Sequence, residues 1–292
     1  MLSGSLVAIV TPMRADGSLD LPAWERLVDF HLHNGTGGIV VGGTTGESAT
    51  LTDAELGELT ERACRHVAGR IPVIAGAGTS STAATVERAR WLSQLPVAAL
   101  LVVTPAYNRP TQEGLYRHFA AVAEAARVPV IAYNVPSRTA VDMLAATTAR
   151  LSQLAGIAGI KEAVARMERI RELKGACRED FVILSGDDAT ARDAVLEGAA
   201  GVISVTANVA PRAMADLIEA ARRGDRPRSG ELDAALAPLH RALFLEPNPI
   251  PVKWALERMG LAGPGIRLPL TPLSGEHQDA VAAALRGAGA LA

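Results

Sequence analysis

Cysteine is almost absent from this 292-residue chain, which contains only Cys64 and Cys177. Two cysteines cannot build a disulfide framework, so the sequence is compatible with a reducing compartment. The chain has 29 Lys and Arg against 31 Asp and Glu, a balance that argues against the basic surface needed to bind nucleic acid or an anionic membrane. No apolar run is long enough for a membrane span, and the N-terminus lacks the basic start of a signal peptide. We therefore expect a cytoplasmic protein without nucleic-acid or membrane partners.

Hydrophobic residues make up 49% of the sequence and lie in many short runs of Val, Ile and Leu. Runs without polar alternation are typical of parallel strands that are buried on both faces. Each run ends in small or polar residues, and helical patterns follow, such as those that open at Asp20 and Thr52. The eight runs begin at Leu6, Gly38, Pro72, Ala98, Pro129, Ile157, Phe181 and Gly201.

Eight strand–helix units predict an α/β fold, a (β/α)8 TIM barrel that occupies residues 1–223. Residues 224–292 would form a C-terminal helical extension packed on the barrel, with helices expected at 230–245, 252–259 and 277–286. A doubly wound open sheet is the rival architecture. It is disfavoured because the first strand is followed by TPMRADGS and not by a glycine-rich dinucleotide-binding turn.

Lysine is the second scarce residue, because arginine supplies nearly all of the positive charge and only Lys161, Lys174 and Lys253 are present. Lys161 ends the apolar run LAGIAGIKEA, at the carboxyl end of a strand, where barrel enzymes place their active sites. Its stem could pack at the barrel mouth while the ammonium reaches water or pairs with Glu162. Alternatively, a low-dielectric site lowers the pKa of an amine from about 10.4 and frees it to attack a carbonyl. We favour the second interpretation, a nucleophilic lysine that forms a Schiff base.

Schiff-base chemistry requires a group that moves protons, and the chain offers only three tyrosines, Tyr107, Tyr116 and Tyr133. Tyr133 ends the strand that precedes the one carrying Lys161, so adjacent strands would bring the phenol beside the amine. The alternative is a tyrosine at the barrel rim whose hydroxyl bonds to the backbone. Paired with Lys161, Tyr133 is predicted to be a general acid and base.

Two further segments at strand ends are suited to bind carboxylates. The glycines of VGGTTGES at 41–48 would let backbone amides approach a small anion, with Thr44 and Thr45 adding hydroxyls. Arg138, in VPSRT, could hold a second carboxylate in a bidentate pair, although a surface arginine on a loop is the alternative. The six histidines have no metal-ligand spacing, and we expect no metal.

These motifs together resemble a known enzyme family, 4-hydroxy-tetrahydrodipicolinate synthase, also called dihydrodipicolinate synthase. The family belongs to the superfamily of pyruvate-dependent class I aldolases and N-acetylneuraminate lyase. The resemblance rests on GTTGES at 43–48, YNVPSRT at 133–139 and GIKEA at 159–163, and it extends through EPNPIPVKWA over nearly the whole chain. It implies a homotetrameric barrel, built as a dimer of dimers, that condenses pyruvate with L-aspartate 4-semialdehyde in the diaminopimelate route to lysine, without a cofactor.

The resemblance also implies a role for each site residue. Lys161 would form the Schiff base with pyruvate and Tyr133 would move the protons, with Thr44 linking it to Tyr107 of the neighbouring subunit. Four further residues would bind substrate: Thr45, the backbone of Ile203 and Gly186 on the pyruvate side, and Arg138 at the carboxylate of the semialdehyde.

Two departures from the family pattern concern the subunit interface. Ala106 replaces a tyrosine that normally stacks across the tight dimer, so we expect a weaker dimer. In lysine-inhibited members, polar residues at the same interface hold the inhibitor. We expect weak or absent lysine inhibition because this chain has other residues at five of those positions: Asp53, Leu56, Ser80, Ala84 and Ala106.

Two alternative functions remain open at this point. Another pyruvate-type aldolase, such as N-acetylneuraminate lyase or a keto-sugar-acid aldolase, would share the lysine and the tyrosine but would hold a long polyhydroxy substrate. Arg138 argues against it, since a site built around one carboxylate should reject such substrates strongly. A catalytically silent barrel used for binding or regulation is the remote alternative, and the intact set of Thr44, Tyr107, Tyr133 and Lys161 argues against that.

Overall fold

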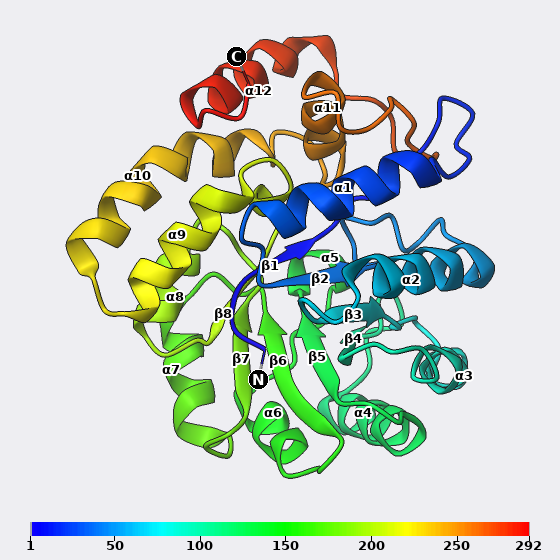
Figure 1. The fold of residues 1–292 in the computed structure, drawn as a ribbon. Helices are drawn as coiled ribbons and strands as arrows, with labels where there is room; N and C mark the ends of the chain where they lie inside the picture. Colours follow the sequence, from blue (N-terminus) through cyan, green and yellow to red (C-terminus); the bar gives the residue numbers. More distant parts are fainter. Residues whose placement is uncertain (1, 292) are drawn as a thin grey trace.

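A computed structural model describes residues 2–291. Eight parallel strands close into a barrel in chain order, with β1 pairing with both β2 and β8 (Figure 1). This topology confirms the (β/α)8 barrel and excludes the open sheet. The strands are β1 (Gly4–Ala8), β2 (Gly38–Val41), β3 (Val73–Gly76), β4 (Ala99–Val103), β5 (Val130–Asn134), β6 (Ile157–Glu162), β7 (Val182–Ser185) and β8 (Gly201–Ser204).

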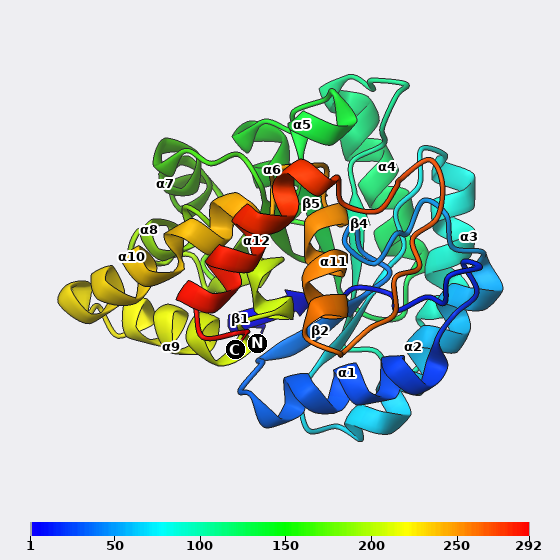
Figure 2. The same cartoon turned by 90° about the horizontal axis from the view of Figure 1, so that it is seen from above.

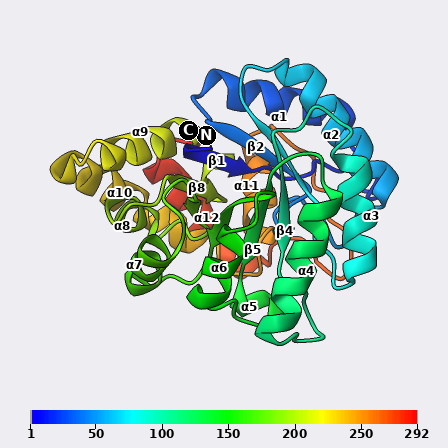
Figure 3. The same cartoon turned by 90° about the horizontal axis from the view of Figure 1, so that it is seen from below.

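The helices surround the strands, as the view from below makes clear (Figure 3). Those of the barrel are α1 (Leu21–His33), α2 (Asp53–Val67), α3 (Thr82–Leu92), α4 (Gln112–Ala125), the one-turn α5 (Pro136–Thr139), α6 (Ala145–Ser152), α7 (Met167–Ala176), α8 (Ala191–Leu196), the 3₁₀ turn η1 (Thr206–Asn208) and α9 (Pro211–Arg222). Three more follow: α10 (Arg226–Ala242), α11 (Ile250–Arg258) and α12 (Gly275–Gly287). The division into a 1–223 barrel and a 224–292 extension stays a prediction; residue 223 lies between α9 and α10.

Local sequence signals account for the helix starts that were expected. The carboxylate of Asp20 accepts a hydrogen bond from the Ala23 N–H at 3.1 Å and caps α1. Thr52 and Glu55 form a reciprocal capping box at the start of α2, in which each side chain bonds to the other residue's N–H. Both caps satisfy amide groups that the first helical turn leaves without partners.

The strands separate two apolar layers. Side chains of successive strand residues point to opposite faces, so one set fills the barrel interior and the other packs against the helices. On β5 and β6, Tyr133 belongs to the interior set, whereas Ile160 packs in the outer layer. The interior set comprises Leu6, Ala8, Val40, Ile74, Ala99, Leu101, Ile131, Tyr133, Val135, Val182, Leu184 and Ile203.

The C-terminal extension bears on the site because α11 lies across the end of the barrel where the strands terminate. Seen from above, α11 crosses the middle of the molecule between β2 and β5, and α12 runs beside it (Figure 2). Within residues 2–291, no helix combines the length and the apolar character that crossing a membrane would require.

Candidate active site

Lys161 and Tyr133 are direct neighbours across the β5–β6 pair, where the strand register places one opposite the other. The Lys161 ammonium nitrogen, Nζ, lies 4.3 Å from the centre of the Tyr133 ring. Both side chains are buried, each residue being 6% exposed. The predicted amine and phenol are therefore brought together in the interior of the barrel, at the carboxyl ends of their strands.

Glu162 does not pair with Lys161, because adjacent residues of a strand face opposite ways. Its carboxylate instead accepts a hydrogen bond from the Arg169 guanidinium of α7 at 3.2 Å. Burial raises the pKa of Glu162, although hydrogen bonds from the Val164 N–H and the Asn134 amide oppose that rise. Among residues 2–291, no carboxylate forms an ion pair with the Lys161 amine. The structure thus excludes the Glu162 pairing that was weighed as an alternative.

The contacts of Glu162 belong to a buried polar network next to β5 and β6. Asn134 donates to the Glu162 carboxylate at 3.1 Å and to Asp142 at 2.8 Å. Arg169 donates to Asp142 at 2.7 Å. Burial opposes ionisation of Asp142, but the hydrogen bonds from Arg169 and Asn134 hold its pKa below the usual value. The network ties β5, β6 and α7 to the segment that follows Arg138.

The absence of a side chain at Gly186 leaves room for the side chain of Lys161. A Cβ added at this position would lie 3.0 Å from Cε of Lys161 and 2.9 Å from Cβ of Ala163. Such contacts are too short for any larger residue, so a side chain here would displace the lysine. Gly186 was expected to line the pyruvate pocket, and it lines the same cavity as Lys161.

The glycine-rich loop after β2 brings Thr44 and Thr45 to the cavity. Most of its amides are used within the turn: the N–H groups of Gly46 and Ser48 donate to Gly43 O, and that of Glu47 donates to Thr44 O. The N–H groups of Thr44 and Thr45 are not among the donors of these turn hydrogen bonds. Of the loop expected to bind an anion, Thr44 and Thr45 are the residues that line the cavity.

Arg138 reaches the cavity from the one-turn helix α5, and its guanidinium donates to the backbone carbonyl of Asn248 at 3.2 Å. The side-chain amide of Asn248 in turn donates to the Thr45 hydroxyl at 3.0 Å. Asn248 therefore connects the threonine loop with Arg138. It lies in the segment EPNPIPVKWA, for which no role in the site was predicted from the sequence.

These groups line one cavity of about 330 Å³ at the carboxyl ends of the strands. It contains six of the eight predicted site residues together with others that the sequence did not single out. The predicted ones are Thr44, Thr45, Tyr133, Arg138, Lys161 and Gly186; the added ones are Val135, Ser137, Ala163, Asp187, Val205, Phe244, Pro247 and Asn248.

The two remaining predicted residues lie elsewhere in the single chain. Ile203 is 1% exposed and belongs to the apolar interior of the barrel on β8. Tyr107 is 95% exposed on the loop after β4, with a positive φ of 72°. A non-glycine residue held in the left-handed region is unusual and is often found at functional sites. Tyr107 thus points out of its own chain, an orientation that its expected role in a neighbouring subunit requires.

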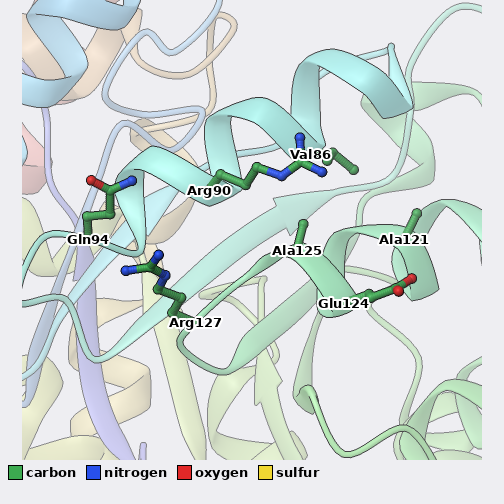
Figure 4. A pocket seen from close by; sticks show the side chains of 7 residues that line it. All are labelled: Val86, Arg90, Gln94, Ala121, Glu124, Ala125 and Arg127. Carbon is green, nitrogen blue, oxygen red and sulfur yellow. The ribbon is translucent and has the colours of Figure 1, made fainter.

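A larger hollow of about 580 Å³ lies between α3 and α4 on the outside of the barrel (Figure 4). Its charged groups, Arg90, Glu124 and Arg127, are all solvent-exposed, and none of the predicted site residues line it. Exposed side chains of this kind are solvated and have ordinary surface chemistry. Within residues 2–291, no group of three or more His, Cys, Asp and Glu has an arrangement that could hold a metal ion.

Comparisons with known proteins cover the entire chain. Residues 1–288 match the dihydrodipicolinate synthetase family. A 4-hydroxy-tetrahydrodipicolinate synthase of Ectopseudomonas mendocina is 55% identical over 292 residues, which cover 100% of both chains. The pyruvate complex of the chloride-inhibited dihydrodipicolinate synthase of Acinetobacter baumannii has a TM-score of 0.98 at 46% identity, with 100% of both chains covered. A monomeric dihydrodipicolinate synthase variant has a TM-score of 0.97 at 42% identity, with 99% of this chain and 98% of that chain covered.

Proposed function

The chain belongs to the dihydrodipicolinate synthetase family, and from that membership we propose that Lys161 binds pyruvate as a Schiff base and Tyr133 moves the protons. The function is that of a 4-hydroxy-tetrahydrodipicolinate synthase, a lyase of lysine and diaminopimelate biosynthesis. The observation that carries the assignment of roles is the pairing of Lys161 with Tyr133 in one buried cavity, with Nζ 4.3 Å from the phenol ring.

The reaction follows from the chemistry of a primary amine beside a phenol. The Lys161 amine attacks the C2 carbonyl of pyruvate, and loss of water leaves an imine. Removal of a C3 proton gives an enamine, whose C3 attacks the aldehyde carbon of L-aspartate 4-semialdehyde. The amine of that substrate then attacks C2, displaces Lys161 and closes the ring. The imine itself accepts the electron pair, so the proposal requires no cofactor.

Proton transfer is assigned to Tyr133, assisted by Tyr107 from a second copy of the chain. Carbinolamine dehydration and enamine formation each transfer a proton, and Tyr133 is the phenol nearest to the amine. Thr44 lines the same cavity and would link Tyr133 to the Tyr107 hydroxyl of a neighbouring subunit. The 95% exposure of Tyr107 in the single chain supports a role that only a second copy can complete.

Pyruvate and the semialdehyde would occupy opposite sides of the cavity. Thr45, Gly186 and the backbone of Ile203 are proposed to hold pyruvate at Lys161. Arg138 is proposed to hold the carboxylate of the semialdehyde, because a guanidinium presents two parallel N–H donors to a carboxylate. Asn248 accepts a hydrogen bond from Arg138 through its carbonyl oxygen, which leaves the other guanidinium donors for substrate.

Replacing Arg138 with lysine is expected to lower kcat/KM for the semialdehyde by about 10- to 100-fold, because an ammonium cannot form the bidentate pair. The KM for pyruvate should change by less than about threefold, since Arg138 is assigned to the other substrate. Steady-state kinetics with each substrate varied in turn measures both. An equal rise in both KM values would contradict the assignment of Arg138.

The assembly is proposed to be a homotetramer, a dimer of dimers, in the cytoplasm. Exchange of Tyr107 between subunits requires at least a dimer. Ala106 has no aromatic ring to stack across the interface, unlike the tyrosine common at this position. The tight dimer should therefore be weaker than in family members that have that tyrosine. Sedimentation of the chain over a range of concentrations tests this proposal, and a dimer that does not dissociate on dilution would contradict a weakened interface.

Lysine is expected to inhibit the enzyme weakly or not at all. Ala84 lacks a carboxylate for the lysine ammonium, and the Asp53 carboxylate is already bound to the Arg88 guanidinium at 2.6 Å. Leu56, Ser80 and Ala106 supply no charged group either. Initial rates with L-lysine raised to millimolar concentrations should stay at the uninhibited value. Half-inhibition at or below about 1 mM, the usual upper limit for small-metabolite affinities, would contradict this expectation.

The assay that tests the function itself is turnover of pyruvate with L-aspartate 4-semialdehyde, coupled to the next reductase and followed by nicotinamide oxidation. Turnover supports the synthase. No turnover, with cleavage of N-acetylneuraminate or a keto-sugar acid to pyruvate, would favour the other pyruvate-type aldolases. No turnover with any of these substrates, and no trapping of pyruvate on the chain, would favour a non-catalytic barrel.

A further inference from the structure

The third lysine of the chain, Lys253, is as deeply buried as Lys161 but has a different partner. It lies on α11 and is 4% exposed, and its ammonium forms an ion pair with the Glu47 carboxylate, whose side chain is 1% exposed. Burial lowers the pKa of Lys253, while the Glu47 carboxylate opposes that fall. Taking both charges out of water is costly, so a buried ion pair is weak evidence for stability alone.

Glu47 belongs to the loop that carries the substrate-binding threonines. Its backbone has a positive φ of 58°, which a non-glycine residue keeps only where its surroundings fix it. Its N–H donates to the carbonyl of Thr44 at 3.1 Å. Its second carboxylate oxygen accepts from the backbone N–H of Arg267 at 3.0 Å. The C-terminal extension thus holds the Glu47 side chain at both oxygens, through Lys253 and through Arg267.

Asn248 lies five positions before Lys253 and contacts both substrate subsites. Its side-chain amide donates to the Thr45 hydroxyl at 3.0 Å. Its backbone carbonyl oxygen accepts from the Arg138 guanidinium at 3.2 Å. Asn248 is 5% exposed, and Oδ1 of its side chain is buried without a hydrogen-bond partner among residues 2–291. Two points near the start of α11 therefore hold the same loop: Asn248 bonds to Thr45, and Lys253 bonds to Glu47.

We propose that the Glu47–Lys253 ion pair is a positioning device that clamps α11 onto the barrel mouth, so that Asn248 holds Thr45 and Arg138 at their substrates. Neither Glu47 nor Lys253 lines the cavity, so the pair would act through Asn248. The inference rests on the proposed function, since Thr45 and Arg138 are the groups assigned to pyruvate and to the semialdehyde. Loss of the clamp would displace both subsites together while Lys161 and Tyr133, held by β5 and β6, stay in place.

The direct test is Lys253→Met, which removes the charge and keeps an unbranched side chain of similar length. We expect the KM values for pyruvate and for the semialdehyde to rise about tenfold each, because small displacements of positioning groups weaken binding strongly. The kcat should fall by less than about threefold. Lys174→Met, at an exposed position on α7, is the matched control and should leave all three constants unchanged.

A double-mutant cycle with Asn248→Ala distinguishes the clamp from general loosening of the fold. If Lys253 acts through Asn248, then Lys253→Met should raise the KM values by less than about threefold further in the Asn248→Ala background. Independent tenfold effects that multiply would overturn the proposed route. Unchanged KM values in the single variant Lys253→Met would overturn the proposal itself.

Lys253→Met leaves the buried Glu47 carboxylate without its counter-charge, and the single variant could fail to fold for that reason. The double variant Glu47→Gln with Lys253→Met removes both charges. It should fold and still have the raised KM values, since the clamping contact is missing; parental KM values in this variant would overturn the proposal. A wild-type chain that neither turns over nor traps pyruvate would instead overturn the proposed function, so the two failures are distinguishable.

Discussion

Replacing Lys161 with alanine is expected to lower kcat by about 10³-fold or more, because no other lysine within residues 2–291 lines the cavity to form the Schiff base. Lys253 cannot substitute, since its ammonium is bound to Glu47 outside the cavity lining. The measurement is the coupled assay with both substrates at saturation. The variant should retain the fold, as the lysine side chain contributes no ion pair to the barrel.

Lys174→Ala is the matched control for this experiment, since it removes one of the three lysines from an exposed site on α7. It should have the parental kcat and KM values. If Lys161→Ala kept more than about a tenth of the parental kcat, covalent catalysis by this lysine would be contradicted.

Tyr133→Phe is expected to lower kcat by about 10² to 10⁴-fold, the range typical of a lost general acid or base. The substitution removes only the hydroxyl and keeps the ring that packs 4.3 Å from the Lys161 amine. The KM for pyruvate should therefore change much less than kcat. Single-turnover measurements should show slower formation of the imine and the enamine and an unchanged initial binding of pyruvate.

Tyr116→Phe serves as the control for loss of a phenol. Tyr116 lies on α4, where the Arg150 guanidinium packs over its ring at 4.1 Å, and it does not line the cavity. Its removal should leave kcat unchanged. A Tyr133→Phe variant that stayed within about threefold of the parental kcat would rule out Tyr133 as the proton-transferring group.

The barrel and its central pair could be predicted because both depend on local sequence. Continuous apolar runs predict buried parallel strands, and consecutive strands of a barrel are neighbours. Tyr133 and Lys161 each end such a run, so their contact follows once β5 and β6 pair. The same reasoning placed Thr44, Thr45 and Arg138 at the mouth, and the family resemblance added Gly186; the cavity includes all four.

The supporting contacts could not be predicted from patterns of this kind. Asn248 and Thr45 are 203 residues apart, and Lys253 and Glu47 are 206 apart. Periodicity predicts that α11 is a helix, but it does not specify where a helix beyond the barrel docks. The one available signal was the scarcity of lysine, which marks Lys253 as much as Lys161.

The orientation of the Glu162 side chain, unlike these long-range contacts, could have been predicted, because it depends only on the alternation of residues along β6. Strand residues alternate between faces, so a residue next to an inward-pointing Lys161 must point outward. Pairing the two side chains was therefore excluded as soon as Lys161 was placed on a strand. The buried Arg169 that Glu162 meets lies on α7, and sequence spacing alone does not identify it as the partner.

The most direct test of the central claim is to trap pyruvate on the chain with borohydride and to locate the adduct by peptide mass spectrometry. Reduction of the imine joins the C2 carbon of pyruvate irreversibly to the attacking nitrogen. We expect one adduct per chain, on the peptide that contains Lys161, and none on those that contain Lys174 or Lys253. Trapping on another lysine, or no trapping in a chain that turns over, would contradict a Schiff base at Lys161.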